Sequence, residues 1–187
     1  MTDEEFKAKL HDPQFVRDLS IPLLPSQETL IRSAIADGTL TPEEIGRILQ
    51  YRWSTFQLDV AQSSNASGES LLVITQRGEL DSRRAVAENP ATPGYVLRVL
   101  LQDPNPEVAA LARNAAAARL CDPQALRSIT KYLGSNVEFP RLMAANPCTP
   151  RDVLMIMSDN SNPEISDLGR AALAKRPLVD QTPPDLQ

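Results

Sequence analysis

Two ten-residue stretches decide the fold of this chain, because they are nearly the same sequence. Residues 84–93 read RAVAENPATP and residues 141–150 read RLMAANPCTP, 57 positions further along with no gap between the aligned copies. The likeness continues through the Asn-Pro-Glu segments that begin at Asn105 and Asn162. Self-similarity at a fixed distance is the signature of a repeat protein, whose units fold by stacking on one another.

The 57 positions between the two aligned stretches contain two copies of a shorter repeat. A degenerate copy begins at Arg113, where Asp122-Pro123 stands in place of the Thr-Pro pair, and a last copy ends at Arg176-Pro177. The arginines that begin the four copies are 29, 28 and 29 residues apart: Arg84, Arg113, Arg141 and Arg170. We call these four residues the arginine ladder, because equivalent positions of stacked repeats line up along one side of the stack.

Each copy carries the start and stop signals of two short helices. A residue that can cap a helix is followed by proline, which is favoured at the first helical position and cannot continue a preceding helix. Apolar residues recur at helical spacing, so Leu97 and Leu154 are expected at equivalent buried sites. A unit of 28 or 29 residues cannot bury such a face alone, so its neighbours must cover it. The pairs of cap and proline are Thr92-Pro93, Asn105-Pro106, Thr149-Pro150 and Asn162-Pro163.

Four regions are expected along the chain: an N-terminal helical cap (1–62), a flexible linker (63–70), the helical repeat domain (71–177) and a disordered tail (178–187). The polar, small residues after position 62 are the reason for placing the linker there. The helices expected in the N-terminal cap are one or two over 3–20, one that Ser26 caps and Gly38 ends, and one over 42–62 that Thr41 caps.

The recurring pattern Arg-x-x-Ala-x-Asn-Pro-x-Thr-Pro-x-x-Val-Leu, followed by Asn-Pro-Glu-Val, resembles the leucine-rich repeat variant, a relative of HEAT-like helical repeats. The resemblance covers residues 82–177. It implies an all-α fold, an α-solenoid of short paired helices. Some members of the family carry an N-terminal cysteine cluster that holds an iron–sulfur centre. Residues 1–78 contain no cysteine, so we expect no such centre and no cofactor.

The composition argues against several classes of function. The 187 residues include 19 basic and 24 acidic side chains, for a net charge of −5, and residues 79–177 carry 12 and 11 of them. Lys and Arg supply most of the affinity for phosphate backbones, so this balance opposes a nucleic-acid binder. No apolar run approaches the roughly 18 residues that span a bilayer, the N-terminus is acidic where a secretory signal is basic, and no phosphate loop or nucleophile motif occurs. We therefore expect a cytoplasmic protein that is not an enzyme and does not span a membrane.

The few cysteine and histidine residues are expected to carry no chemistry. Cys121 and Cys148 fall at nearly equivalent positions of adjacent copies, but stacked helices lie about 8–10 Å apart, whereas a disulfide needs Cα atoms within about 7 Å. Buried free thiols in a reducing compartment are therefore favoured over a disulfide. His11 is the only histidine, and we expect it at the surface or in a helix cap. No residue is predicted to be catalytic or to bind a metal.

The arginine ladder has two interpretations. It could form a basic stripe that binds an acidic protein surface or a phosphate backbone, which makes Arg84, Arg113, Arg141 and Arg170 candidate partner-binding residues. We favour the other interpretation, in which each arginine reaches a carboxylate of the neighbouring unit, such as Glu107 or Glu164, or carbonyl groups at a helix C-terminus. The positions belong to the repeat pattern, and nearby acids almost cancel the bases.

Aromatic residues gather in the segment 51–56. Trp53 and Phe56 share the apolar face and are expected in the core, whereas Tyr51 and Arg52 lie off it and are the other candidates for contact with a partner. The predicted function is a scaffold or adaptor whose repeat face binds another protein, argued from architecture and from the missing catalytic motifs. The alternative is a nucleic-acid-binding HEAT-like protein whose arginine ladder grips phosphates, which the charge balance opposes.

Overall fold

The structure is a computed structural model, and it describes residues 1–19, 22–134 and 137–176. In these ranges every regular element is a helix and no strand occurs. The predicted disordered tail, residues 178–187, lies outside the described residues. The elements are α1 (Asp3–Lys9), α2 (Pro13–Asp18), α3 (Pro25–Ala36), α4 (Pro42–Tyr51), α5 (Trp53–Gln62), α6 (Gly68–Arg77), α7 (Leu80–Glu88), α8 (Gly94–Leu100), α9 (Pro106–Arg119), α10 (Pro123–Ser128), the 3₁₀ helix η1 (Thr130–Tyr132), α11 (Glu138–Ala145), α12 (Arg151–Ser158) and α13 (Pro163–Ala174).

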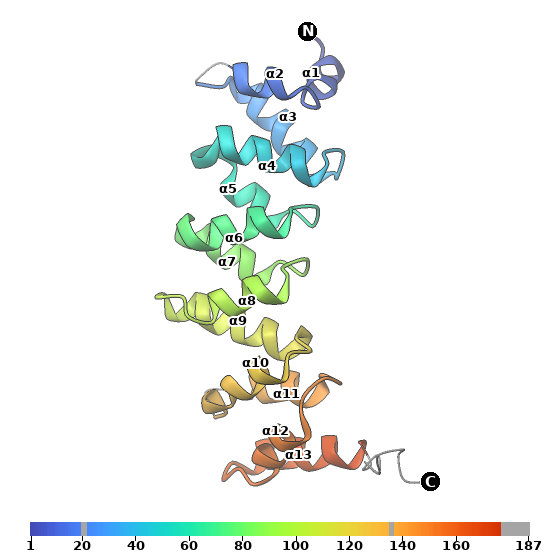
Figure 1. Ribbon diagram of the computed structural model, residues 1–187, viewed down its shortest axis with the longest axis vertical. Coiled ribbons are helices and arrows are strands. Elements are labelled where there is room, and N and C mark those ends of the chain that lie inside the picture. The colour runs from blue at the N-terminus through green and yellow to red at the C-terminus, as the bar shows by residue number, and fades with distance from the viewer. Residues whose placement is uncertain (20–21, 135–136, 177–187) are drawn as a thin grey trace, which may run out of the picture. The chain divides into compact units, whose positions relative to one another are not determined.

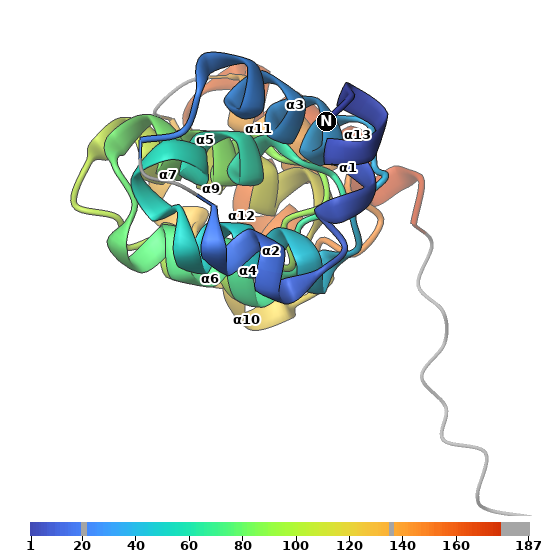
Figure 2. The same cartoon turned by 90° about the horizontal axis from the view of Figure 1, so that it is seen from above.

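The chain divides into two compact units, residues 1–112 and 113–187, and α9 begins in the first and ends in the second. The helices of the first unit form two rows, which Figure 1 shows from the side and Figure 2 from above. The odd row consists of α1, α3, α5 and α7, which contact one another in turn, and the even row consists of α2, α4, α6 and α8. This stack of paired helices is an α-solenoid, as predicted.

The second unit continues the alternation along the chain, with α10 and α12 in the place of even-row helices and α11 and α13 in the place of odd-row helices. Both α11 and α12 pack against α13. Gly169 of α13 permits the closer of these contacts, because a Cβ atom there would lie 2.5 Å from the backbone nitrogen of Ser158 and 2.9 Å from the carbonyl oxygen of Leu154. The absence of a side chain therefore sets how near the two helices can lie.

The repeat begins earlier in the structure than it can be recognised in the sequence. Helices α5 and α7 end at the C-cap residues Ser63 and Asn89, which are 26 residues apart. The Ser63 hydroxyl donates to the carbonyl oxygen of Ile35, and the Asn89 carboxamide donates to that of Ala61, 28 residues earlier in both cases. Residues 1–62, predicted as a separate cap, thus consist of helix pairs of the same kind as the predicted repeat domain.

The predicted flexible linker over 63–70 is a turn and the first residues of a helix. Ser63 is 6% exposed, and the Asn65 side chain donates to the carbonyl oxygen of Leu40. The Ser67 hydroxyl caps α6, which begins at Gly68. The boundary between compact units falls at 112/113 instead. Small polar residues serve here as caps and anchors, and composition alone does not distinguish that use from a linker.

The single helix predicted over 42–62 is two helices, because the backbone of Arg52 leaves the helical conformation at φ −134° and ψ 42°. Its side chain is buried, and its guanidinium donates to the carbonyl oxygens of Leu19 and Tyr51. Leu19 is distant in the sequence, so the partner that holds Arg52 at this break cannot be found from the local helix signals. The prediction of one helix was therefore wrong.

Most other helix boundaries agree with the prediction. The Asp12 side chain caps α2, and Thr41 forms a complete capping box at the start of α4. Gly38 has a φ of 76°, the left-handed conformation that stops a helix at low cost for glycine. Ser26 is an exception, because the N-cap of α3 is Leu24 and the helix begins at Pro25, two residues earlier than a cap at Ser26 requires. Proline fixes its own φ at a helical value, which favours that start.

The Thr-Pro pairs do not cap the helix that follows them. The hydroxyls of Thr92 and Thr149 donate to the carbonyl oxygens of Val86 and Met143, both at 2.6 Å. These carbonyl groups belong to the last turns of α7 and α11, whereas the prolines after the threonines are the N-cap residues of α8 and α12. Each threonine therefore satisfies the end of the preceding helix, and its predicted role as an N-cap was wrong.

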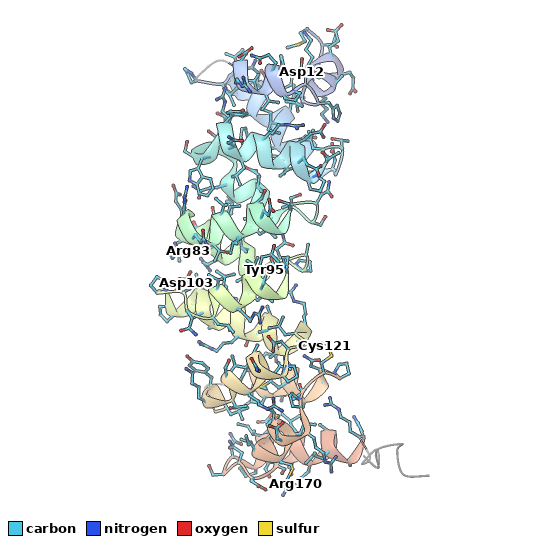
Figure 3. The ribbon with its side chains drawn as sticks, in the orientation of Figure 1. Asp12, Arg83, Tyr95, Asp103, Cys121 and Arg170 are labelled. Carbon is cyan, nitrogen blue, oxygen red and sulfur yellow. A yellow bond between two sulfur atoms is a disulfide. The ribbon has the colours of Figure 1, made fainter. Side chains whose placement is uncertain are left out.

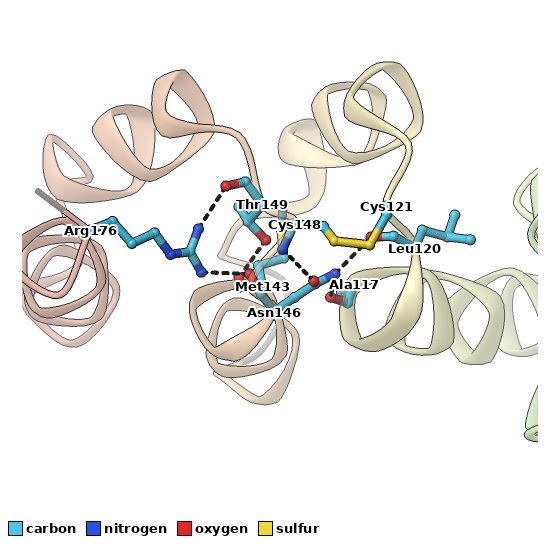
Figure 4. Close-up of a disulfide and its surroundings, with 8 residues drawn as sticks. All are labelled: Ala117, Leu120, Cys121, Met143, Asn146, Cys148, Thr149 and Arg176. Atoms are coloured by element: carbon cyan, nitrogen blue, oxygen red, sulfur yellow. Dashed lines mark hydrogen bonds between the residues drawn. A yellow bond between two sulfur atoms is a disulfide. The ribbon is translucent and has the colours of Figure 1, made fainter. Parts of the chain in front are cut away.

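The asparagine of each Asn-Pro-x-Thr-Pro loop joins its own helix pair to the previous one. The side-chain nitrogen of Asn146 donates to the carbonyl oxygens of Ala117 and Leu120 at 2.9 Å each, and its oxygen accepts from the backbone of Cys148 at 2.9 Å (Figure 4). Asn89 makes the equivalent pair of bonds, at 2.8 and 2.9 Å, to the end of α5. Both asparagines are 4% exposed. Buried backbone groups at the ends of neighbouring helices are satisfied in this way.

Cys121 and Cys148 form a disulfide, contrary to the prediction of free thiols (Figure 4). Their Cα atoms are 4.8 Å apart, inside the range that the bond requires. The prediction used the distance between stacked helices, but neither cysteine lies in a helix. Both lie in loops after α9 and α11, and Asn146 draws those loops together through its bonds to Ala117 and Leu120.

Removing this disulfide should lower the free energy of unfolding by about 3 kcal/mol, because a bond between residues 27 apart restricts the unfolded chain. Urea unfolding of the Cys121→Ser/Cys148→Ser variant, followed by circular dichroism, measures the loss. The wild type in reducing agent serves as the control and should match the variant. A change below about 0.5 kcal/mol would mean that packing and the Asn146 bonds alone hold the two loops.

Candidate functional site

A groove opens on the even row of the first unit, between α4 and α6, and reaches the start of α8. Its volume of about 970 Å³ lies at the upper end of the roughly 300–1,000 Å³ of typical ligand pockets. Side chains of α4, α6 and α8 line it, together with Trp53 from the first turn of α5. The groove is therefore formed by helices of successive repeats, as expected for a binding surface on a solenoid.

Two glycines line the groove, Gly46 of α4 and Gly68 of α6. Gly46 is the fifth residue of α4, and the fifth residue of α10 is Arg127, whose guanidinium pairs with Asp152 of α12 at 2.6 Å. That hydrogen-bonded partner holds the pKa of the Asp152 carboxyl below its ordinary value. Gly46 has no side chain to fill the corresponding space. At Gly68 a Cβ atom would collide with the hydroxyl of Tyr95, so this glycine lets the Tyr95 ring lie against the start of α6.

Exposed apolar side chains line the groove, and an exposed apolar residue recurs at the same helix position elsewhere in the chain. Val73 is 37% exposed and Tyr95 is 44% exposed, and both line the groove. Val99 of α8 is 42% exposed and holds the same place in its helix as Val73. Ile156 of α12 also holds this place and is 51% exposed. Tyr95 lies on α8 (Figure 3). An apolar residue thus recurs on the surface at one position of the repeat, where only packing against another molecule would bury it.

Four charged residues line the groove: Glu43, Arg47, Glu69 and Arg77. The Arg47 guanidinium lies 3.9 Å from Glu44, at the limit of an ion pair, and its Nε atom is buried without a hydrogen-bond partner in the described structure. Within the described residues, Glu43, Glu69 and Arg77 take part in no hydrogen bond or ion pair of their side chains. The charged side chains of Glu43, Glu69 and Arg77 are therefore available for contact with another molecule.

Glu44, next to Glu43, differs because its carboxylate has partners within the protein. Its carboxylate accepts from the backbone of Thr41 at 2.7 Å and lies 2.8 Å from Nδ1 of His11. Burial raises the pKa of Glu44, but the hydrogen bonds from Thr41 and His11 outweigh burial and leave the pKa below its ordinary value. His11 therefore assists a helix cap, in agreement with its predicted place.

Two members of the arginine ladder make the contacts that we favoured from the sequence. Arg84 pairs with Glu107 at 2.6 Å, and Arg141 pairs with Glu164 at 2.6 Å. Both carboxylates were named from the repeat pattern, and the geometry of the two pairs is the same because the residues are equivalent. The pairs are partly exposed, with side-chain exposures of 39 to 57%, so each contributes little stability.

The other two members of the ladder differ from this pattern. The Arg113 guanidinium lies 4.1 Å from the centre of the Tyr132 ring, a cation–π contact. Arg170 pairs within its own helix with Asp167 at 2.8 Å (Figure 3). Arg176, which is outside the ladder, donates to the backbone oxygens of Thr149 and Asn146 in the loop after α11 (Figure 4).

The most buried ion pair belongs to Arg83, beside the ladder. Arg83 donates to Asp103 through two nitrogens, at 2.8 and 3.3 Å, and the Asp103 side chain is 3% exposed (Figure 3). Arg83 also donates to the carbonyl oxygen of Gly78 at 2.8 Å. The pair joins α7 to the loop after α8. The sequence analysis missed it, because Arg83 has no counterpart in the second copy, where Pro140 stands.

Tyr51 and Arg52, the remaining candidates for partner contact, serve the fold. Arg52 is 8% exposed and occupies the break between α4 and α5, and the Arg17 guanidinium lies 5.9 Å from the centre of the Tyr51 ring. Phe56 is fully buried, as expected. Trp53, expected in the core, is partly exposed and lines the groove. Trp53 is the first residue of α5, directly after the break at Arg52, whereas Phe56 lies one turn further into the helix.

Residues 80–105 match the model of one protein family, the leucine rich repeat variant. This segment is thus similar to a leucine-rich repeat variant. It comprises α7, the Asn-Pro-x-Thr-Pro loop and α8, and it ends at Asn105, whose side chain accepts hydrogen bonds from the start of α9. No curated protein and no solved structure matches the chain significantly.

None of the described helices is both long enough and apolar enough to cross a membrane. In the described part of the chain, His, Cys, Asp and Glu side chains also form no group of three or more that could hold a metal ion. The groove remains as the candidate site.

Proposed function

We propose that this protein is a non-enzymatic helical-repeat scaffold that binds a segment of another protein in the groove between α4 and α6. One observation carries the proposal: a single groove combines exposed apolar side chains with charged groups that have no ion-pair partner among the described residues. The segment 80–105, which is similar to a leucine-rich repeat variant, supplies α7 and α8, and α8 contributes Tyr95 to the groove.

The chemistry of the groove suits a protein partner. Tyr, Trp and Arg are the residue types that most often dominate binding energy at protein interfaces, and Tyr95, Trp53 and Arg47 all line this groove. Repeated helix pairs also offer a long surface on which one side can be free for contact. The valines at positions 73 and 99 extend the apolar surface from α6 to α8.

Nucleic acid is the alternative partner, and the contacts of the arginine ladder oppose it. To bind phosphates, Arg84 and Arg141 would have to leave Glu107 and Glu164, and those carboxylates would then repel the phosphates. Titration with a duplex DNA oligonucleotide at several salt concentrations tests this. Tight binding whose logarithm falls steeply with the logarithm of salt would favour the nucleic-acid function over a protein partner.

Replacing Val73 by Asp should abolish binding of the protein partner, because a carboxylate would be desolvated in the apolar part of the groove. The test is quantitative capture of partners from the native host by the wild type and by Val73→Asp. We expect at least a tenfold loss of the specific partner, by the size of hot-spot effects. The matched control is Leu58→Asp on α5, an odd-row residue that is 39% exposed, against 37% for Val73. Equal recovery with Val73→Asp and the wild type would refute the proposal.

A cytoplasmic location remains part of the proposal, and the cysteine pair offers a test of it. Disulfides are rare in the reducing cytosol and persist in oxidising compartments. Protein quenched with acid in intact cells can be alkylated with a maleimide before and after reduction. A cytoplasmic protein should react largely before reduction, whereas protein that reacts only after reduction belongs to an oxidising compartment.

A further inference from the structure

The four charged residues of the groove are ordered along it. Glu43 and Glu69 are the second residues of α4 and α6, whereas Arg77 is the last residue of α6. The two helices run in the same direction (Figure 1), so both glutamates lie at the same end of the groove and Arg77 lies at the other. At 1.5 Å per residue of helix, the Cα atoms of Glu69 and Arg77 are about 12 Å apart along α6.

We infer that the groove recognises an extended segment of a partner protein that carries a basic side chain and, about four residues away, an acidic one. This inference rests on the proposed function and specifies its ligand. The basic side chain pairs with Glu43 and Glu69, and the acidic one pairs with Arg77. An extended chain rises about 3.3 Å per residue, so roughly four residues span the 12 Å between the ends. An apolar side chain between the two charges lies against Val73.

The two ends differ in how well their charges are satisfied without a partner. Glu43 and Glu69 belong to the first turns of their helices, where the helix dipole already favours a negative charge. At the other end, the Arg77 side chain is exposed and has no ion-pair partner among the described residues. A carboxylate of the partner supplies the missing acceptor at that end.

Charge sets the specificity of this site more than its affinity. Each exposed ion pair contributes little to the free energy of binding, and like charges at the same distance oppose binding by a similar amount. Apolar contact with Val73, Trp53 and Tyr95 supplies the affinity, whereas exchanging one charge of the peptide turns an attraction into a repulsion at one end. We therefore expect about a tenfold preference between peptides that differ in one charge.

Fluorescence anisotropy with the full chain at low salt tests the inference. The probes are four labelled, end-capped peptides: Lys-Ala-Leu-Ala-Glu, Lys-Ala-Leu-Ala-Lys, Glu-Ala-Leu-Ala-Glu and Gln-Ala-Leu-Ala-Gln. The mixed-charge peptide should bind about tenfold more tightly than either like-charge peptide, with the neutral peptide in between. Binding of none of the four, or the same affinity for all, would overturn the inference.

Charge reversal in the groove should change the ranking in a defined way. Glu69→Lys leaves Glu43 opposite the new lysine, so that end of the groove becomes neutral and the mixed-charge peptide should lose its advantage over the peptide with two glutamates, whereas Arg77→Glu makes both ends acidic and should prefer the peptide with two lysines. Glu88→Lys on α7 is the control, because Glu88 is exposed on the odd row and the net charge changes by the same amount as in Glu69→Lys. A ranking that does not follow the groove charge, or that also changes in Glu88→Lys, refutes the inference.

This outcome can be separated from that of the proposed function. If Val73→Asp loses the captured partner while the peptide ranking ignores charge, the scaffold function stands and the charge order is wrong. If Val73→Asp keeps the partner, the groove is not the binding surface, whatever the peptides show.

Discussion

Replacing Asn146 by Ala should lower the free energy of unfolding by about 3–6 kcal/mol, the largest effect expected for a single substitution in this chain. The change removes three hydrogen bonds, to the carbonyl oxygens of Ala117 and Leu120 and from the backbone nitrogen of Cys148. Asn146 is 4% exposed, so water does not replace the lost partners. Each buried backbone group left without a partner costs about 1–3 kcal/mol.

Chemical denaturation followed by circular dichroism, with the disulfide intact, measures this loss. Asn146→Asp keeps the shape and the bond from Cys148 but places a carboxylate against two carbonyl oxygens, so at neutral pH it should be at least as destabilising. Asn162→Ala is the matched control: it removes the exposed N-cap of α13 and should cost about 1 kcal/mol. If Asn146→Ala costs no more than Asn162→Ala, the anchor does not hold the neighbouring helix pairs together.

Leu97→Ala and Leu154→Ala should each lower the free energy of unfolding by about 2–5 kcal/mol. The two leucines occupy equivalent positions of α8 and α12 and are 1% and 0% exposed. Each substitution leaves a cavity that the helices cannot close readily, and for Leu154 the reason is visible in the backbone. Its carbonyl group already lies close to Gly169 of α13, which leaves little room for further approach.

The same unfolding experiment on Met155→Ala provides the control for the leucine variants. Met155 follows Leu154 in α12 but is 52% exposed, so its truncation should cost less than about 0.5 kcal/mol. A small effect at Leu97 or Leu154, comparable to that of Met155→Ala, would show that the aligned copies do not bury equivalent residues.

Helix starts could be predicted from the sequence because their causes are local. Asp12 and Thr41 bond to backbone groups two or three residues away, and a cap followed by proline identifies such a site from a few letters. The repeat was recognisable because Asn89 and Asn146 make equivalent hydrogen bonds to the preceding helix pair, so the same residue occurs at both positions. Any exchange at these positions leaves buried carbonyl groups without donors.

The corrections share a different physical cause, which is a partner far away in the sequence. Arg52 donates to Leu19, 33 residues earlier, and so marks a break that the local helix signals do not show. The hydroxyls of Thr92 and Thr149 donate to carbonyl oxygens of the preceding helix and do not cap the helix that follows. The disulfide depends on where two loops meet, and helix spacing says nothing about that.

The groove was missed although part of its signal is in the sequence. Val99 and Ile156 stand 57 positions apart, like the aligned stretches, and Val73 precedes Val99 by one period of 26. An apolar residue at a position that the core does not need is a sign of a contact surface. Gly46 and Gly68 also line the groove, and only coordinates show that a side chain at the first would meet Ser70 and that one at the second would collide with Tyr95.

The anchors at Ser63 and Asn89 have a consequence for how such a chain can change in length. Each reaches back one period and no further, so excision of residues 64–89 would join Ser63 to Pro90 without removing the bond from Ser63 to Ile35. Duplication of residues 64–89 would likewise add an anchoring side-chain donor for the added backbone carbonyl acceptors. Gain or loss of whole periods is thus compatible with a stable fold. A deletion of any other length would move the anchoring side chains away from the backbone carbonyl groups to which they donate.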